Sequence, residues 1–114
     1  MAQYMLFLRG GEASGVEMTP EQAEANRAPY AAWAGKLSRE GKLINAEEVD
    51  GRHLTLHRPN GHVVTDGPFP ETRETVVGFF LIQVQDEQEA LDIAAACPIL
   101  ERGGKVDLHR IIEG

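Results

Sequence analysis

Residues 76–84 read VVGFFLIQV, and this stretch decides the fold. β-branched and aromatic side chains at this density favour a strand, and apolar residues on both of its faces indicate a central position in a sheet. Asp86 follows, with Glu89 three residues later, an acidic pair that predicts the start of a helix. An apolar stripe continues to Cys97, and Pro98 ends the helix. The second half of the chain is therefore predicted to begin with a strand followed by a helix.

The first half of the chain predicts the same order. Residues 4–8 (YMLFL) form an apolar, aromatic-rich run typical of a buried strand. Residues 19–22 (TPEQ) supply an N-cap threonine, a proline at the first helical position and a glutamine three residues after the cap. Gly41 stands where a glycine in the left-handed conformation is expected to end the helix. Pro29 removes a backbone donor inside this helix, so we expect a kink or a break near Ala28.

Four further strands complete the predicted fold. Residues 43–49 can form a short strand, and residues 53–57 (HLTLH) alternate between polar and apolar positions. Residues 59–61 (PNG) form a turn that leads into a partner strand at residues 62–65, and residues 105–112 form the last strand. The order is β-α-β-hairpin-β-α-β. It predicts an α+β, ferredoxin-like fold with two helices on one face of a mainly antiparallel sheet.

The size of the chain and its apolar content predict one domain that forms a dimer. The 114 residues are enough for a single packed core, so we expect one domain over residues 1–114. Residues 4–8 and 76–84 carry apolar side chains on both faces, more than two short helices can bury. We therefore expect a second copy to pack sheet to sheet as a two-fold homodimer, a dimeric α/β barrel.

The composition of the chain argues against nucleic acid and membranes as partners. The formal charge is −7, with 18 acidic and 11 basic residues, and the basic residues are scattered, which argues against nucleic acid and anionic membrane surfaces. The longest apolar stretch, residues 76–84, is far below the roughly 20 residues of a membrane span. The N-terminus lacks the basic start of a secretory signal, so a cytoplasmic location is expected. Cys97 is the only cysteine, and we expect a buried structural thiol.

Residues 66–74 (DGPFPETRE) are the candidate functional segment, and two interpretations of it are open. A glycine that permits positive φ and two prolines that fix φ could make the segment only a stiff connector. In the functional interpretation, the Asp66 carboxylate is held by a rigid turn and followed by Glu71, Arg73 and Glu74. Such a site would position an acid or a base beside a cation.

The four histidines do not form a coherent set of metal ligands. His53 and His57 share a strand face but are about 13 Å apart at the rise of a strand, too far for one metal ion. We expect both to face solvent. His62 lies beside the turn, and whether it shares a face with His57 depends on a register that the sequence does not fix. His109 faces either the sheet cavity or the solvent.

One family resembles this chain over nearly its whole length. Residues 64–74 (VTDGPFPETRE), followed by residues 78–82 (GFFLI) and the acidic-capped helix with residues 89–91 (EAL), resemble the DGPF-domain branch of the YCII-related proteins. The resemblance implies a ferredoxin-like fold in dimeric α/β barrels, and most members lack an assigned reaction. The wider barrel group includes isomerases, dehalogenating lyases and monooxygenases that act on small organic molecules without a common cofactor.

The resemblance also implies site residues. Some YCII-related proteins have been credited with a His–Asp pair, and Asp66 stands where they have the aspartate. Residues 4–9 contain no histidine, so any histidine partner of Asp66 would come from elsewhere in the chain, and the sequence leaves open which histidine that is. His109 is the second catalytic candidate. The substrate-binding candidates are the other members of the segment: Gly67, Pro68, Phe69, Glu71, Arg73 and Glu74.

Three functional hypotheses follow. The first is an enzyme that acts on a small organic molecule with neither a cofactor nor a metal, in which Asp66 accepts or donates a proton. Arg73 would orient an anionic group, with Glu71 or Glu74 in support. The second is a non-catalytic module that binds a small ligand and signals through the dimer. In the third, residues 66–74 only stiffen the dimer.

Overall fold

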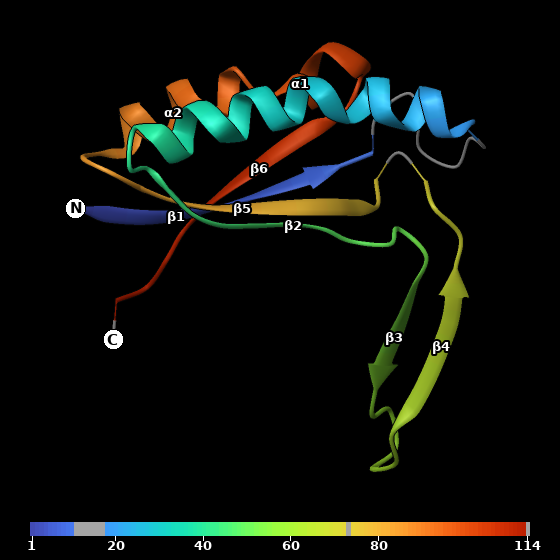
Figure 1. Cartoon of the computed structure of the whole chain (residues 1–114). Coiled ribbons are helices and arrows are strands. Elements are labelled where there is room, and N and C mark those ends of the chain that lie inside the picture. The colour runs from blue at the N-terminus through green and yellow to red at the C-terminus, as the bar shows by residue number, and fades with distance from the viewer. Residues whose placement is uncertain (11–17, 73, 114) are drawn as a thin grey trace.

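A computed structural model describes residues 1–10, 18–72 and 74–113 of the chain. Four strands form an antiparallel sheet in the order β2-β5-β1-β6, and α1 and α2 lie together on one of its faces (Figure 1). This arrangement confirms the predicted α+β, ferredoxin-like fold. In chain order the elements are β1 (Ala2–Arg9), α1 (Pro20–Arg39), β2 (Leu43–Glu48), β3 (His53–His57), β4 (Val64–Phe69), β5 (Val76–Val84), α2 (Glu87–Ala95), the 3₁₀ helix η1 (Pro98–Arg102) and β6 (Lys105–Arg110).

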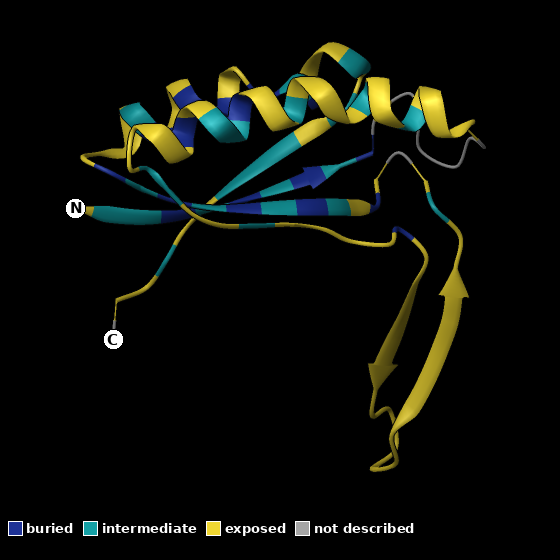
Figure 2. Ribbon diagram, in the orientation of Figure 1, coloured by how far each residue is buried: buried dark blue, intermediate teal, exposed yellow. Residues whose placement is uncertain are grey.

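The core lies between the two helices and the sheet. Side chains alternate along β1 and β5, so every second residue faces the helices, and these residues are buried (Figure 2). Leu6 of β1 is fully buried and lies opposite Phe80 of β5 in the antiparallel register. The residues between them point to the face without helices and are only half-buried: Met5, Phe7, Phe79 and Leu81.

Helix α1 begins as predicted and continues past its proline. The Thr19 side chain accepts from the Gln22 backbone N–H, and the Gln22 side chain accepts from the Thr19 N–H, which completes the capping box. The expected break near Ala28 is wrong, since the helix is continuous from Pro20 to Arg39. Pro29 has no backbone N–H, so the carbonyl of Ala25 lacks the hydrogen-bond donor that a helix normally provides. Ala25 is exposed, so water can satisfy that carbonyl.

Helix α2 also begins where the sequence predicts. The Asp86 side chain accepts from the Glu89 N–H at 2.9 Å. The helix ends at Ala95, and Pro98 opens the 3₁₀ helix η1. Cys97 is buried between them, and burial raises the pKa of its thiol to about 11. Of the helices within the described ranges, none has the length and apolar character needed to cross a membrane.

Strands β3 and β4 form a separate two-stranded sheet that projects from the body on the side away from the helices (Figure 1). Every residue of the two strands is exposed (Figure 2). This projecting hairpin explains why the radius of gyration is 15.9 Å, above the roughly 13 Å of a compact domain of this size. The expectation that the strand ends at residue 65 and a rigid turn begins at Asp66 is wrong, because residues 66–69 form the second part of β4 and pair with β3.

Candidate functional site

The register of the projecting hairpin brings a histidine to Asp66. Thr55 lies opposite Asp66, and His57 lies opposite Val64, so His57 and Asp66 are diagonal neighbours on one face of the hairpin. His57 Nε2 contacts Asp66 Oδ2. The two side chains are 47% and 48% exposed. The structure thus brings a histidine and Asp66 together from two adjacent strands.

The chemistry of the two side chains assigns the proton in this pair. An ionised carboxylate only accepts hydrogen bonds, so the Nε2 that contacts Asp66 must carry a hydrogen. In neutral His57, this leaves Nδ1 as the nitrogen with the lone pair. Asp66 therefore orients the ring so that Nδ1 can accept a hydrogen bond.

Gly67, Pro68 and Phe69 build the strand that carries Asp66. Gly67 has φ of 109°, and a Cβ there would lie 2.8 Å from the His53 carbonyl oxygen and 2.9 Å from the Phe69 nitrogen, so only glycine fits. The peptide bond between Gly67 and Pro68 is cis. The Phe69 ring packs against the His53 ring with 5.4 Å between centroids. A role in substrate binding stays a prediction for all three residues.

Glu71 fixes the base of the hairpin. Its Oε1 accepts from the Gly51 backbone N–H at 3.1 Å, which links the two ends of the hairpin. Gly51 is buried, and a Cβ there would lie 2.3 Å from the Glu71 side chain. A side chain at position 51 would therefore displace the Glu71 carboxylate from this contact. Glu71 therefore anchors the base of the hairpin. Its role in substrate binding stays a prediction.

Glu74 belongs to a cluster of charges at one end of the sheet. Its carboxylate pairs with Arg9 at 2.7 Å and with Lys105 at 3.0 Å, and Arg9 also pairs with Asp107 at 2.7 Å. The hydrogen bond and charge of Lys105, and then the charge of Arg9, hold the pKa of Glu74 below its ordinary value. Glu74 thus contacts β1 and β6. Arg73, the predicted cation, lies outside the described residues.

His109 lies on β6, on the face of the sheet without helices. It is opposite Met5 in the register, it is exposed, and its ring meets the Phe7 ring edge-on with 5.3 Å between centroids. The structure brings His57 to Asp66, whereas His109 packs on the sheet. Sequence reasoning placed His57 in solvent and did not pair it, because the pairing depends on the hairpin register. Within the described ranges, no three His, Cys, Asp or Glu side chains gather as metal ligands would.

Comparison with known proteins agrees with this architecture. A protein of Rhizobium meliloti (strain 1021) described as uncharacterized is 40% identical over 62 residues, which are 54% of this chain and 47% of that protein. The chain therefore matches about half the length of this relative. The sequence model of the YCII-related domain matches residues 2–113. The chain belongs to the YCII-related domain family.

Proposed function

We propose that this protein catalyses proton transfer on a small organic molecule at the His57–Asp66 pair. The contact between His57 Nε2 and Asp66 Oδ2 is the observation that carries the proposal. A histidine oriented by a carboxylate is a common general base, because its proton affinity suits neutral pH and its ring is held in one orientation. The family and the relative that match this chain leave the reaction open.

In the proposed step, His57 Nδ1 accepts a proton from the substrate, and Asp66 stabilises the imidazolium. The same proton then returns to the substrate, at the original atom or at a neighbouring one. The overall reaction is an isomerisation or a proton exchange, and it changes neither the oxidation state nor the atom count. It requires no cofactor, in keeping with a site built from two side chains.

A homodimer would give this pair the dry environment that acid–base chemistry favours. Half-exposed side chains are well solvated in a single chain, and solvent weakens their mutual interaction. The hairpin that carries them also exposes large apolar side chains: Leu54 at 57%, Leu56 at 62%, Val63 at 56% and Phe69 at 42%. Leu54 and Leu56 alternate with His57 along β3 and so lie on its other face. A second copy that encloses both faces of the hairpin would bury this apolar area and desolvate the pair. We therefore propose that the active form is a two-fold dimer.

The experiment follows proton transfer itself, so that it needs no known product. Small carbonyl compounds and carboxylic acids are incubated with the protein in D₂O, and mass spectrometry detects deuterium incorporation. Asp66→Asn and His57→Asn should each lower the exchange rate by about 10²-fold or more, since each removes one half of the base. His53→Asn is the matched control, because His53 lies on the same strand and packs on Phe69.

Retained exchange in a folded Asp66→Asn protein would remove Asp66 from the chemistry. The double variant gives a second criterion. Two residues that act as one unit lose little more together than separately, so the double variant should match either single variant. Additive losses would mean that His57 and Asp66 do not act as a unit.

A second function, binding of a small ligand without turnover, is supported by the half exposure of the pair in the single chain. In that case the hairpin would close over a ligand, and occupancy would change the dimer. No compound would then exchange deuterium, and a ligand that raises the thermal midpoint of the wild type would also raise that of Asp66→Asn. The deuterium experiment and a thermal-shift screen together separate the two functions.

A further inference from the structure

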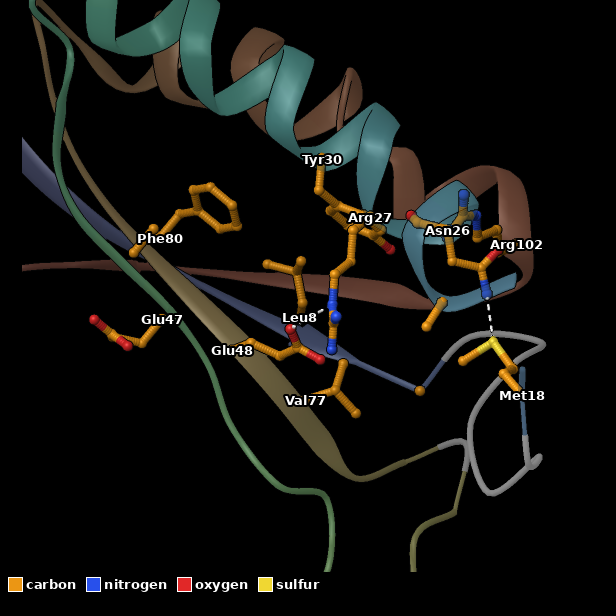
Figure 3. Close-up of a pocket in the computed structure, with 14 residues that line it drawn as sticks. Leu8, Met18, Asn26, Arg27, Tyr30, Glu47, Glu48, Val77, Phe80 and Arg102 are labelled. Carbon is orange, nitrogen blue, oxygen red and sulfur yellow. Dashed lines mark hydrogen bonds and ion pairs between the residues drawn. The ribbon is translucent and has the colours of Figure 1, made fainter. Parts of the chain in front are cut away.

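A cavity lies between α1 and the face of the sheet that α1 covers. Its volume is about 310 Å³, within the range of small-molecule sites. Helix α1, strands β1, β2 and β5 and the helix η1 all contribute to its wall (Figure 3). Neither His57 nor Asp66 is among the lining residues, and the hairpin that carries them projects on the opposite side of the sheet (Figure 1). The cavity is therefore a different place from the proposed proton-transfer site.

Most of the cavity wall is apolar. Leu8, Val77 and Phe80 come from β1 and β5, while Ala23 and the ring of Tyr30 come from α1. Burial raises the pKa of the Tyr30 phenol, so its hydroxyl stays protonated and can donate a hydrogen bond inside the cavity. A wall of this kind favours a ligand with an apolar body and few polar groups.

Arg102 is a charged residue of the cavity wall that has no carboxylate partner among the described residues. Its side chain comes from η1, its Nη1 donates to the Asn26 carbonyl oxygen at 2.9 Å, and its guanidinium carbon lies 5.3 Å from the centroid of the Tyr30 ring. The residue is half-buried. Across the described ranges, no carboxylate lies within 4.0 Å of it, although other arginines have such partners. A guanidinium has five N–H donors in a fixed fork that matches a carboxylate, so an anion from outside would complete this site.

An acidic side chain of β2 would disfavour a second negative charge on the ligand. Arg27 reaches from α1 to Glu48 of β2, with 3.4 Å between Nε and Oε2, and the two side chains are 66% and 70% exposed (Figure 3). Exposed pairs of this kind contribute little and open readily. Glu48 lies opposite Gly78 on the helix-covered side of the sheet, and its charge would repel a second anionic group on the ligand.

We infer that this cavity binds a small monocarboxylic acid with an apolar aromatic or aliphatic body, whose carboxylate pairs with Arg102. The apolar body occupies the space between α1 and the strands, and the Tyr30 hydroxyl provides a second donor. The inference does not rest on the proposed proton transfer, and its test leaves the hairpin unchanged. Failure of one therefore says nothing about the other.

The probes are phenylacetate and hexanoate, each compared with its neutral amide. Titration is followed by the backbone amide shifts of the ¹⁵N-labelled protein at millimolar probe concentrations. We expect both carboxylates to shift the amides of residues such as Ala23, Tyr30 and Val77. Phenylacetamide and hexanamide should bind at least about tenfold more weakly, because they cannot form the charged pair with Arg102.

Two variants and a control make the test specific. Arg102→Gln should weaken both carboxylates by about tenfold or more and leave the amides unchanged. Ala23→Phe should fill the cavity and abolish binding of all four probes, with the fold verified by its spectrum. Arg39→Gln changes an exposed arginine in the last turn of α1, the helix that carries Ala23, and should bind like the wild type.

Three results would overturn the inference: no shift of the lining amides with either carboxylate, equal binding of acids and amides, or carboxylate binding by Arg102→Gln that equals that of the wild type. In each case the Arg102 pairing is absent, and the cavity does not select a carboxylate.

Discussion

Side chains alternate between the two faces of the strands in both the body of the protein and its projecting hairpin, but only the body buries one of these faces. In β1 and β5, every second residue is buried beneath the helices, and Leu6 and Ile82 are fully inaccessible. In β3, Leu54 and Leu56 occupy equivalent alternate positions but remain 57% and 62% exposed. An isolated two-stranded hairpin is marginally stable in water. The helices thus cover one face of the body, whereas the hairpin presents an apolar face that a partner would cover.

The largest expected effect comes from substituting one leucine in each region. Leu6→Ala should lower the free energy of unfolding by about 2–5 kcal/mol, because it leaves a cavity in a packed core. In dilute protein, where a dimer has dissociated, Leu56→Ala should change it by no more than about 0.5 kcal/mol. Urea denaturation of both variants measures the difference. Equal losses in dilute protein would mean that the hairpin is as tightly packed as the core.

A second prediction concerns the apolar face of the hairpin. Replacing Leu54 and Leu56 together by glutamate should convert the proposed dimer to monomers, because four charges would be buried at a two-fold interface. Sedimentation equilibrium provides the mass. Ile112→Glu is the matched control, since Ile112 is a 93% exposed apolar residue outside the hairpin, and it should leave the mass unchanged. A double variant that sediments like the wild type would place any interface elsewhere.

A third prediction uses the thiol in the body. Because the pKa of Cys97 rises from 9.0 to about 11 on burial, the folded chain keeps the thiol proton at pH values where the unfolded chain loses it. The contribution of Cys97 to stability is thus fully present below pH 9 and declines as the pH rises toward 11. At neutral pH, a disulfide reagent such as DTNB should react slowly with the folded protein and rapidly in denaturant. Rapid reaction without denaturant would show that this part of the body opens.

The smallest expected effect comes from Glu74→Gln. The charges of Lys105 and Arg9 lower the pKa of Glu74, so its contribution to stability is present above its ordinary value of 4.5 and is lost as the pH falls through its lowered value. Because Glu74 is exposed, the decrease in thermal midpoint at neutral pH should be slight and should shrink with added salt. A large decrease that persists in high salt would contradict a surface role.

The sequence predicted most of the body because local signals there agree with one another. The capping pair at Asp86, the capping box at Thr19 and the dense β-branched and aromatic run at residues 76–84 each specify one element. The break expected at Pro29 was wrong because the proline lies on the exposed side of a helix that packs through Trp33 and Leu37. Packing of that face outweighed the loss of one backbone donor.

The site was harder to predict, because it depends on register. The sequence indicated Asp66, but pairing it with His57 requires knowing that Thr55 lies opposite Asp66, with a register shift between His53 and Thr55. A slip of one residue would have placed the histidine on the other face. Glu71 likewise contacts Gly51, 20 residues earlier, through a contact that local patterns do not encode.

The most direct test of the central claim, that the hairpin is completed by a second copy, is an isotope-filtered NMR experiment. Protein labelled with ¹³C is mixed with unlabelled protein, and nuclear Overhauser effects are recorded from the methyl groups of Leu54 and Leu56. The account predicts signals from these methyls to protons of the unlabelled chain, in particles of twice the 12.5 kDa mass of one chain. Particles of 12.5 kDa with no such signals would contradict it.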